Sequence, residues 1–108
     1  MMPKVDWSSS QRRALSATEI VSGLAQLEGW TLQGEGPELA IAKAFVFADF
    51  YETMAFVNAV AFAAHTSDHH PALEITYKRC VVKFNTHDVG GISNTDFECA
   101  NTIDALLQ

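Results

Sequence analysis

Two pairs of predicted strands, each joined without an intervening helix, constrain the fold of this chain more than any other feature. The first pair spans residues 30–33 and 39–47, and the second spans residues 73–78 and 80–86. Parallel neighbours need a long crossover connection, usually a helix, whereas antiparallel neighbours can be joined by a short turn. The two pairs therefore predict an antiparallel sheet with the helices packed on one of its faces.

Segment 39–47 carries the clearest strand pattern. Its large apolar side chains recur at every second position, and Lys43 is the one polar interruption among them. These apolar residues are Leu39, Ile41, Phe45 and Phe47. A period of two with one bulky face is typical of a strand packed on helices. The same alternation predicts the second pair, although the Lys78-Arg79 junction lacks the Asn-Gly or Asp-Gly of an easy hairpin turn.

Three helices are predicted from their capping residues, because a Ser or Asp that can cap a helix stands three residues before an acidic residue. The three pairs are Ser16 with Glu19, Asp49 with Glu52, and Ser93 with Asp96. The first helix is expected over residues 17–28 and ends at Gly29. The second is expected to run to about His65, and the third to include Leu107. Apolar stripes are predicted on the second helix at Phe50, Met54, Val57, Ala61 and Ala64, and on the third at Phe97, Ala100, Ile103 and Leu107.

The resulting order is helix, strand, strand, helix, strand, strand, helix. We therefore predict an α+β fold in which a four-stranded antiparallel sheet carries three helices on one face (α-β-β-α-β-β-α). Residues 14–108 are expected to form a single domain, in keeping with the length of 108 residues. Residues 1–13 are polar, contain Pro3 and a run of three serines, and are predicted to be a flexible N-terminal arm.

Composition and charge exclude several classes of function. The net charge of −6 argues against non-specific nucleic-acid binding, which needs clustered Lys and Arg. We expect no membrane contact, because no apolar run is long enough to span a bilayer, and the chain does not start like a signal peptide. Cys80 and Cys99 have no metal-ligand spacing and are predicted to be free, partly buried thiols in the cytoplasm.

All four histidines lie between residues 65 and 87, at His65, His69, His70 and His87. Histidine is the side chain whose unperturbed pKa allows both acid and base forms near neutral pH. A group of three or four such residues is what proton-transfer chemistry or a metal site requires.

The residues around these histidines form a spaced set that resembles the signature of the pterin-4a-carbinolamine dehydratases. The set consists of His69-His70-Pro71, Tyr77, Thr86-His87, Gly90-Gly91 and Asp96, and it extends upstream to Gly29-Trp30 and to Phe45, Phe47, Asp49 and Phe50. The resemblance runs from Ser16 to the end of the sequence. Each piece is weak alone, whereas the complete spaced set is specific.

The resemblance implies dehydration of a 4a-hydroxytetrahydropterin to a quinonoid dihydropterin, which recycles the tetrahydropterin cofactor of aromatic amino acid hydroxylases. In this reaction a proton leaves N5 while the 4a-hydroxyl group leaves as water. One acid and one base suffice, and each well-placed proton transfer contributes roughly 10²–10⁴-fold to the rate. No nucleophile or electron carrier is needed, so we expect neither a cofactor nor a metal. The family's habit also implies a homodimer or homotetramer.

The resemblance also implies roles for individual residues. His69, His70 and His87 are predicted to be catalytic, with His69 and His87 as the acid–base pair and His70 binding or orienting the pterin. The predicted substrate contacts are Asp96, His65, Thr86, Asp88 and Trp30. Many family members have Glu at the position of His65, so that either His65 or Asp68 could take the place of this carboxylate.

Other interpretations of these residues stay open. His65-x-x-Asp68-His69 resembles a short inverted zinc-protease pattern, although such a pattern needs Glu as the base. Asp96 fits a capping role at a helix N-terminus, and Trp30 is more often a core residue than a platform for a pterin. A protein-binding module is the alternative class of function, because some relatives of this fold act as partners of transcription factors or as assembly factors.

Overall fold

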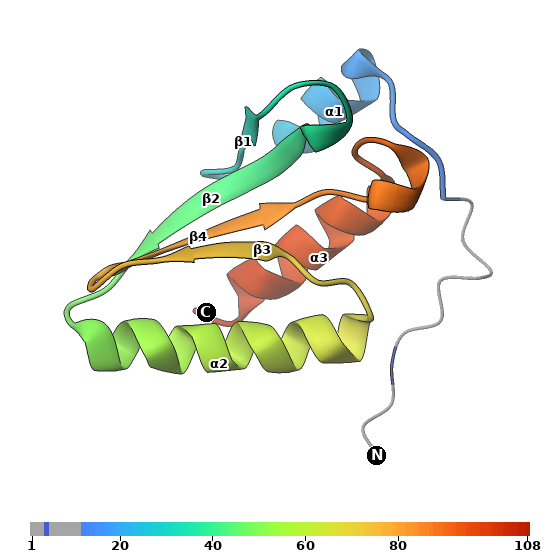
Figure 1. Cartoon of the computed structure of the whole chain (residues 1–108). Coiled ribbons are helices and arrows are strands. Elements are labelled where there is room, and N and C mark those ends of the chain that lie inside the picture. Colours follow the sequence, from blue (N-terminus) through green and yellow to red (C-terminus); the bar gives the residue numbers. More distant parts are fainter. Residues whose placement is uncertain (1–3, 5–11) are drawn as a thin grey trace.

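The element order of the computed structural model, which describes residue 4 and residues 12–108, confirms the predicted α+β class (Figure 1). The helices are α1 (Ala17–Leu24), α2 (Phe50–Ser67) and α3 (Asn94–Ala105), and the strands are β1 (Thr31–Gln33), β2 (Ala40–Val46), β3 (Ala72–Ile75) and β4 (Arg79–Phe84). Two short 3₁₀ turns, η1 (Gly36–Glu38) and η2 (His87–Val89), were not predicted. Most of the predicted N-terminal arm, residues 1–3 and 5–11, lies outside the described residues.

The four strands form one antiparallel sheet in the order β1-β2-β4-β3. Ile41 of β2 pairs with Phe84 of β4, and both side chains are buried in the core. Because side chains alternate along a strand, their neighbours Ala40 and Lys83 lie on the opposite face, which we call the open face. The pairing of Gln33 with Ala40 continues this face onto β1.

The connection between β3 and β4 is tight, as predicted, but it turns at Tyr77 and Lys78, one residue before the predicted Lys78-Arg79 junction. The backbone N–H of Thr76 donates to the carbonyl of Arg79 at 2.8 Å. Neither tip residue has a positive φ, so the turn does not use the geometry that favours Asn-Gly. Tertiary contact supports it instead, because the Thr53 hydroxyl of α2 donates to the carbonyl of Tyr77 at 3.0 Å.

All three helices contribute to the core on the other face of the sheet. The core contains Ile20 and Leu27 near α1, Phe56, Val60 and Ala63 of α2, Phe97, Ala100 and Ile103 of α3, and Ile41, Phe45, Val82 and Phe84 of the sheet. No helix among the described residues is both long and apolar enough to cross a membrane.

The predicted stripe of α2 was correct at Ala64 and otherwise wrong by about one residue. The buried residues are Thr53, Phe56, Val60, Ala63 and Ala64. Phe50 is 48% exposed and stacks on Tyr77 with ring centroids 6.2 Å apart, and Ala61 faces solvent. The helix is rich in apolar residues on several sides, so that periodicity alone did not identify the side that packs on the sheet. Leu107, predicted to be buried beside α3, is 55% exposed.

Helix α1 ends at Leu24, four residues earlier than predicted. Beyond it the chain continues in tighter turns, in which the N–H of Leu27 donates to the carbonyl of Leu24 at 3.1 Å. This tightening turns Leu27 into the core, where its side chain is 7% exposed. Gly29 then takes a left-handed conformation with φ 86°, as predicted for the residue that ends this segment.

Candidate active site

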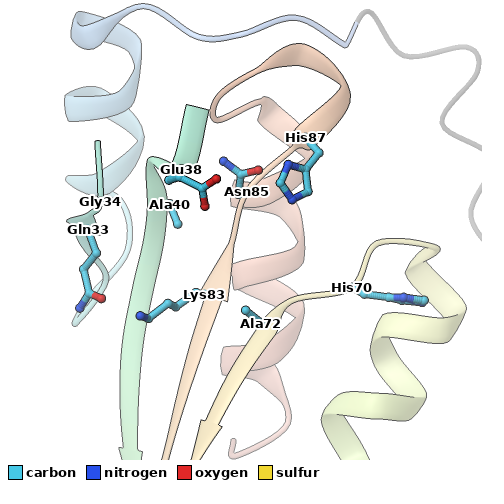
Figure 2. Close-up of a pocket in the computed structure, with 9 residues that line it drawn as sticks. All are labelled: Gln33, Gly34, Glu38, Ala40, His70, Ala72, Lys83, Asn85 and His87. Carbon is cyan, nitrogen blue, oxygen red and sulfur yellow. The ribbon is translucent and has the colours of Figure 1, made fainter. Parts of the chain in front are cut away.

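A pocket of about 390 Å³ lies on the open face, at the end of the sheet where β4 finishes and β3 begins (Figure 2). Its lining residues are Gln33, Gly34, Glu38, Ala40, His70, Ala72, Lys83, Asn85 and His87. Two of the four histidines, His70 and His87, thus share one cavity although they are far apart in sequence.

The end of α2 determines which way His69 and His70 point. Asp68 follows the helix in a left-handed conformation with φ 51°, and the N–H of His69 donates to the carbonyl of Ala64 at 3.2 Å. The chain then extends through Pro71 into β3, so that successive side chains point to opposite sides. His69 is buried, with 9% of its surface exposed, whereas His70 is exposed and lines the pocket.

His87 stands at the start of η2, in the loop that follows β4. The backbone N–H of Thr86 donates to the carbonyl of Gly91 at 2.9 Å, which closes the loop at its base. Gly90 allows this closure because it has φ 71°, a conformation that glycine adopts without strain. The loop therefore holds the His87 side chain at the rim of the pocket (Figure 2).

His69 forms a buried pair with Asp96. Nε2 of His69 lies 2.6 Å from Oδ1 of Asp96, and the Asp96 side chain is fully buried. The His69 ring also stacks on Phe84, with centroids 5.7 Å apart and an angle of 10° between the planes. The imidazole is therefore fixed both by its hydrogen bond and by its apolar neighbour.

The second carboxylate oxygen of Asp96 accepts two further hydrogen bonds. The hydroxyl of Thr86 donates to Oδ2 at 2.8 Å, and the backbone N–H of Ser93 donates to it at 2.9 Å. The Thr86 and Ser93 hydroxyls lie 2.7 Å apart. Since Thr86 gives its only proton to Asp96, Ser93 must donate to Thr86.

This network identifies the proton that His69 contributes. With Oδ2 already occupied by two donors, Oδ1 of the carboxylate accepts the Nε2–H of His69. In the tautomer that donates from Nε2, the lone pair of the ring is on Nδ1, on the side away from Asp96. Asp96 therefore selects one tautomer of His69 in addition to orienting the ring.

Thr86 and Asp96, both predicted substrate contacts, are fully buried and do not line the pocket. Asp96 also accepts from the backbone of Ser93, the residue that precedes α3, as expected for a residue in the first helical turn. Thr86 bonds to Asp96 and Ser93, and Asp96 bonds to His69, which does not line the pocket either.

The other predicted contacts lie apart from the pocket lining. His65 is half-buried in the last turn of α2, and Asp88 is exposed and pairs with Arg12 at 3.3 Å. Trp30 is 4% exposed in the core, where its indole N–H donates to Asp104 at 3.0 Å. The core interpretation of Trp30 therefore agrees with its position.

Sequence reasoning did not identify Gln33, Glu38, Lys83 or Asn85 as pocket residues. Strand alternation placed Lys83 and Asn85 opposite the core side chains of β4, which was the one available signal for two of them. Gln33 and Glu38 reach the pocket only because β1 pairs with β2 and η1 folds over the sheet. That arrangement depends on contacts distant in sequence.

The residues that resemble a zinc-protease pattern are not arranged as such a pattern requires. Helix α2 ends at Ser67, so that His65 and His69 are not one turn apart on a continuous helix. Within residue 4 and residues 12–108, no three His, Cys, Asp or Glu side chains are grouped so that they could hold a metal ion.

Comparison with known proteins identifies the family. Residues 13–106 match the family model described as pterin 4 alpha carbinolamine dehydratase. A curated protein of Paracidovorax citrulli whose name places it among the pterin-4-alpha-carbinolamine dehydratases is 61% identical over 107 residues, covering 99% of this chain and 92% of the relative. A similarly named protein of Bdellovibrio bacteriovorus is 57% identical over 98 residues, covering 87% and 78% of the two chains.

Two solved structures share the fold of this chain. The crystal structure of a transcriptional coactivator/pterin dehydratase from Brucella melitensis superimposes with a TM-score of 0.81 at 29% identity, covering 89% of this chain and all of that one. A pterin dehydratase-like protein identified as a RuBisCO assembly factor shares the fold, with a TM-score of 0.61 at 22% identity over 73% of this chain and 89% of that one. The chain therefore belongs to the pterin-4a-carbinolamine dehydratase family of hydro-lyases, as its histidine signature predicted.

Proposed function

We propose that this chain removes water from a 4a-hydroxytetrahydropterin by acid–base catalysis with its histidines. The observation that supports the proposal is that His70 and His87, from different loops, line the same pocket. Its volume of about 390 Å³ lies within the usual range for small-molecule sites, roughly 300–1,000 Å³. The pocket is open to solvent on the sheet face, so that product water can leave.

In the proposed reaction, one imidazole takes the proton from N5 of the pterin while a second, protonated imidazole gives a proton to the 4a-hydroxyl group. The carbon–oxygen bond at C4a breaks, water leaves, and the electrons of the N5–H bond form the C4a–N5 double bond. The product is a quinonoid dihydropterin, and no electrons are exchanged with the protein. Two histidines on different loops suit this task because the two reacting groups are on neighbouring ring atoms.

The geometry favours His70 with His87 as the groups that exchange protons with the substrate. Sequence reasoning had paired His69 with His87, but His69 is buried and one of its ring nitrogens is bonded to Asp96. We therefore assign His69 to positioning: it fixes the start of the His69-His70 segment, so that His70 is presented to the pocket. Asp96 and Thr86 act through His69.

The proposed product connects this reaction to aromatic amino acid hydroxylases. An enzyme that oxidises a tetrahydropterin and leaves a hydroxyl group on C4a must supply the substrate, and a reductase must consume the quinonoid product. We propose a cytoplasmic setting for this cycle. Cys80 and Cys99 are both free, as predicted, and they are buried rather than partly buried; free thiols are in keeping with a reducing compartment.

The test is a direct dehydration assay with purified protein and a 4a-hydroxytetrahydropterin, in which the wild type is compared with His70→Ala and His87→Ala. We expect each variant to lower kcat/KM by roughly 10²-fold or more, the scale of one lost proton transfer. Asn58→Ala, an exposed change on α2 outside the pocket, is the matched control. Wild-type kcat/KM in both folded histidine variants would refute histidine catalysis in this pocket.

A second function, protein binding, is favoured by apolar side chains at the opposite end of the sheet. Val46, Phe50, Tyr51 and Tyr77 are 73%, 48%, 84% and 62% exposed. The Brucella relative is named both a transcriptional coactivator and a pterin dehydratase. We propose that this apolar group contacts another protein molecule, in the first place a second copy of the chain. Phe50→Ser with Tyr51→Ser should reduce the oligomeric mass and preserve dehydration, whereas an unchanged mass would refute the surface.

A further inference from the structure

Glu38 places a carboxylate in the pocket, and this group has no partner among residue 4 and residues 12–108. It lines the cavity together with Lys83, the other charged side chain of the lining besides the histidines. Lys83 forms an ion pair with Glu74, so that the positive charge of its ammonium group is already compensated. Among the described residues, no hydrogen bond or ion pair involves the side chain of Glu38, so that its carboxylate is available to a ligand.

The loop around Glu38 is held in place by contacts on both sides of it. The side-chain amide of Asn85 donates to the carbonyls of Pro37 at 3.1 Å and Leu39 at 2.6 Å, the two residues that flank Glu38. Gly34 has φ 85°, and a Cβ atom there would lie 2.6 Å from the carbonyl oxygen of Glu38. Position 34 must therefore be glycine for the loop to approach the Glu38 carbonyl this closely. The hydrogen bonds from Asn85 hold the loop against the end of β4.

We infer that Glu38 recognises the pyrimidine ring of the pterin, an inference that rests on the proposed function. The 2-amino-4-oxo ring presents two adjacent donors, N3–H and one N–H of the 2-amino group. A carboxylate accepts two such parallel hydrogen bonds, and hydrogen bonds to a charged acceptor are stronger than neutral ones. In Figure 2 the Glu38 carboxylate points towards the middle of the lining residues, which include His70 and His87.

This assignment divides the pocket between two tasks. The loop between β1 and β2 supplies Glu38 for the ring that does not react, while the loops after α2 and β4 supply His70 and His87 for the ring that does. A contact that is equally strong in the ground and transition states lowers KM without raising kcat, and we assign the contact of Glu38 with the non-reacting ring to this class. Glu38 should therefore affect KM and the binding constant more than kcat, and it should select pterins by their 2-amino group.

The test is a thermodynamic cycle between one residue and one ligand group. Binding of a stable dihydropterin and of its analogue without the 2-amino group is measured by calorimetry for the wild type, Glu38→Gln and Glu35→Gln. Gln keeps one acceptor and adds a donor that opposes the ligand's N–H groups. Glu35 is exposed in the same loop and does not line the pocket, so that its variant controls for net charge.

We expect Glu38→Gln to raise the Kd of the dihydropterin by roughly 3- to 30-fold, less than a fully buried charged hydrogen bond would cost. Glu35→Gln should bind like the wild type. The analogue should bind the wild type less tightly, and Glu38→Gln should discriminate little between the two ligands. Equal discrimination by the wild type and Glu38→Gln would overturn the inference.

The outcomes for Glu38 and for the dehydratase reaction can be distinguished. If the wild type dehydrates a 4a-hydroxypterin but Glu38→Gln leaves KM and Kd unchanged, the inference alone fails. If the wild type binds the dihydropterin through Glu38 but does not accelerate dehydration, the proposed function fails and the recognition role stands. If the wild type binds no pterin, both are wrong.

Discussion

Nε2 of His69 and Oδ1 of Asp96 lie 2.6 Å apart, in a part of the molecule that solvent barely reaches. They come from the segment after α2 and from the first turn of α3, so that one hydrogen bond joins the segment that leads to His70 with α3. Both oxygens of the carboxylate are engaged, because Thr86 and Ser93 donate to Oδ2 while His69 contacts Oδ1. The pair therefore links helix packing to the orientation of the histidine segment.

The first prediction concerns Asp96→Asn. The amide can accept from Thr86 and Ser93 with its oxygen, which leaves its NH₂ group facing Nε2 of His69. His69 must then accept at Nε2 and carry its proton on Nδ1, the opposite tautomer. We expect ¹⁵N NMR of the imidazole to report this exchange and kcat/KM to fall by roughly 10-fold or more through misplacement of the His70 segment. An unchanged tautomer in a folded variant would contradict the network.

The second prediction compares two substitutions of Thr86. Thr86→Val keeps the shape of the side chain but removes a donor to Asp96 and an acceptor for Ser93, while Thr86→Ser keeps both. An unsatisfied buried polar group costs about 1–3 kcal/mol. We expect urea denaturation to show that Thr86→Val lowers the free energy of unfolding by this amount and that Thr86→Ser lowers it by less. If Thr86 acts through Asp96, Thr86→Val should change kcat more than the KM for the pterin. If Thr86 contacted the substrate directly, the substitution would mainly raise KM.

The third prediction separates His69 from His70 by stability. His69→Ala leaves Oδ1 of Asp96 buried without a donor, so that the free energy of unfolding should fall by about 2 kcal/mol or more. His70→Ala removes an exposed side chain and should change it by about 0.5 kcal/mol or less. Urea denaturation of both variants checks this difference, with His87→Ala as a second exposed substitution. Equal losses for His69→Ala and His70→Ala would contradict the different environments described for the two residues.

The sequence predicted the fold well because the relevant signals are local. The caps Ser16 and Asp49 accept from the N–H groups of Glu19 and Glu52, as the three-residue spacing indicated. Alternation along β2 and β4 separated the core face from the open face. The buried side of α2 was missed because Phe50 and Ala61 are as apolar as the residues that pack, and the sheet rather than the sequence pattern selects among them.

The candidate site was predicted only in part, for a physical reason that His69 and His70 illustrate. Two adjacent residues of one type carry no sequence signal for which of them is buried. The choice depends on the left-handed turn at Asp68 and on Asp96, which is distant in sequence. Glu38 was missed for a similar reason, because its place in the pocket depends on bonds from Asn85 to the neighbouring carbonyls.

The fourth prediction is that the protein is a homodimer or homotetramer in solution. The exposed apolar residues Val46, Phe50, Tyr51 and Tyr77 form a group on a small domain, and burying apolar surface contributes about 25 cal/mol per Å². Light scattering at tens of micromolar should therefore give a mass at least twice that of the 11.8 kDa chain. Tyr51→Glu, which places a charge in the apolar group, should shift the mass towards the monomer. A monomer mass for the wild type would contradict the prediction.

The last prediction concerns stability at alkaline pH. Burial raises the pKa of the Cys99 thiol to about 12, and the charge of Asp96 adds to this effect. In the unfolded chain the thiol ionises near its ordinary pKa of 9.0. Above that pH the unfolded state has therefore lost a proton that the folded state keeps, so that the free energy of unfolding falls as pH rises from about 9 towards 12.

Cys99→Ala removes this contribution, and its urea-denaturation midpoint should decline less steeply between about pH 9 and pH 11 than that of the wild type under reducing conditions. Asn94→Ala, an exposed change on the same helix that leaves both thiols in place, should follow the wild type. Identical slopes for Cys99→Ala and the wild type would mean that the buried thiol does not contribute to the loss of stability at alkaline pH.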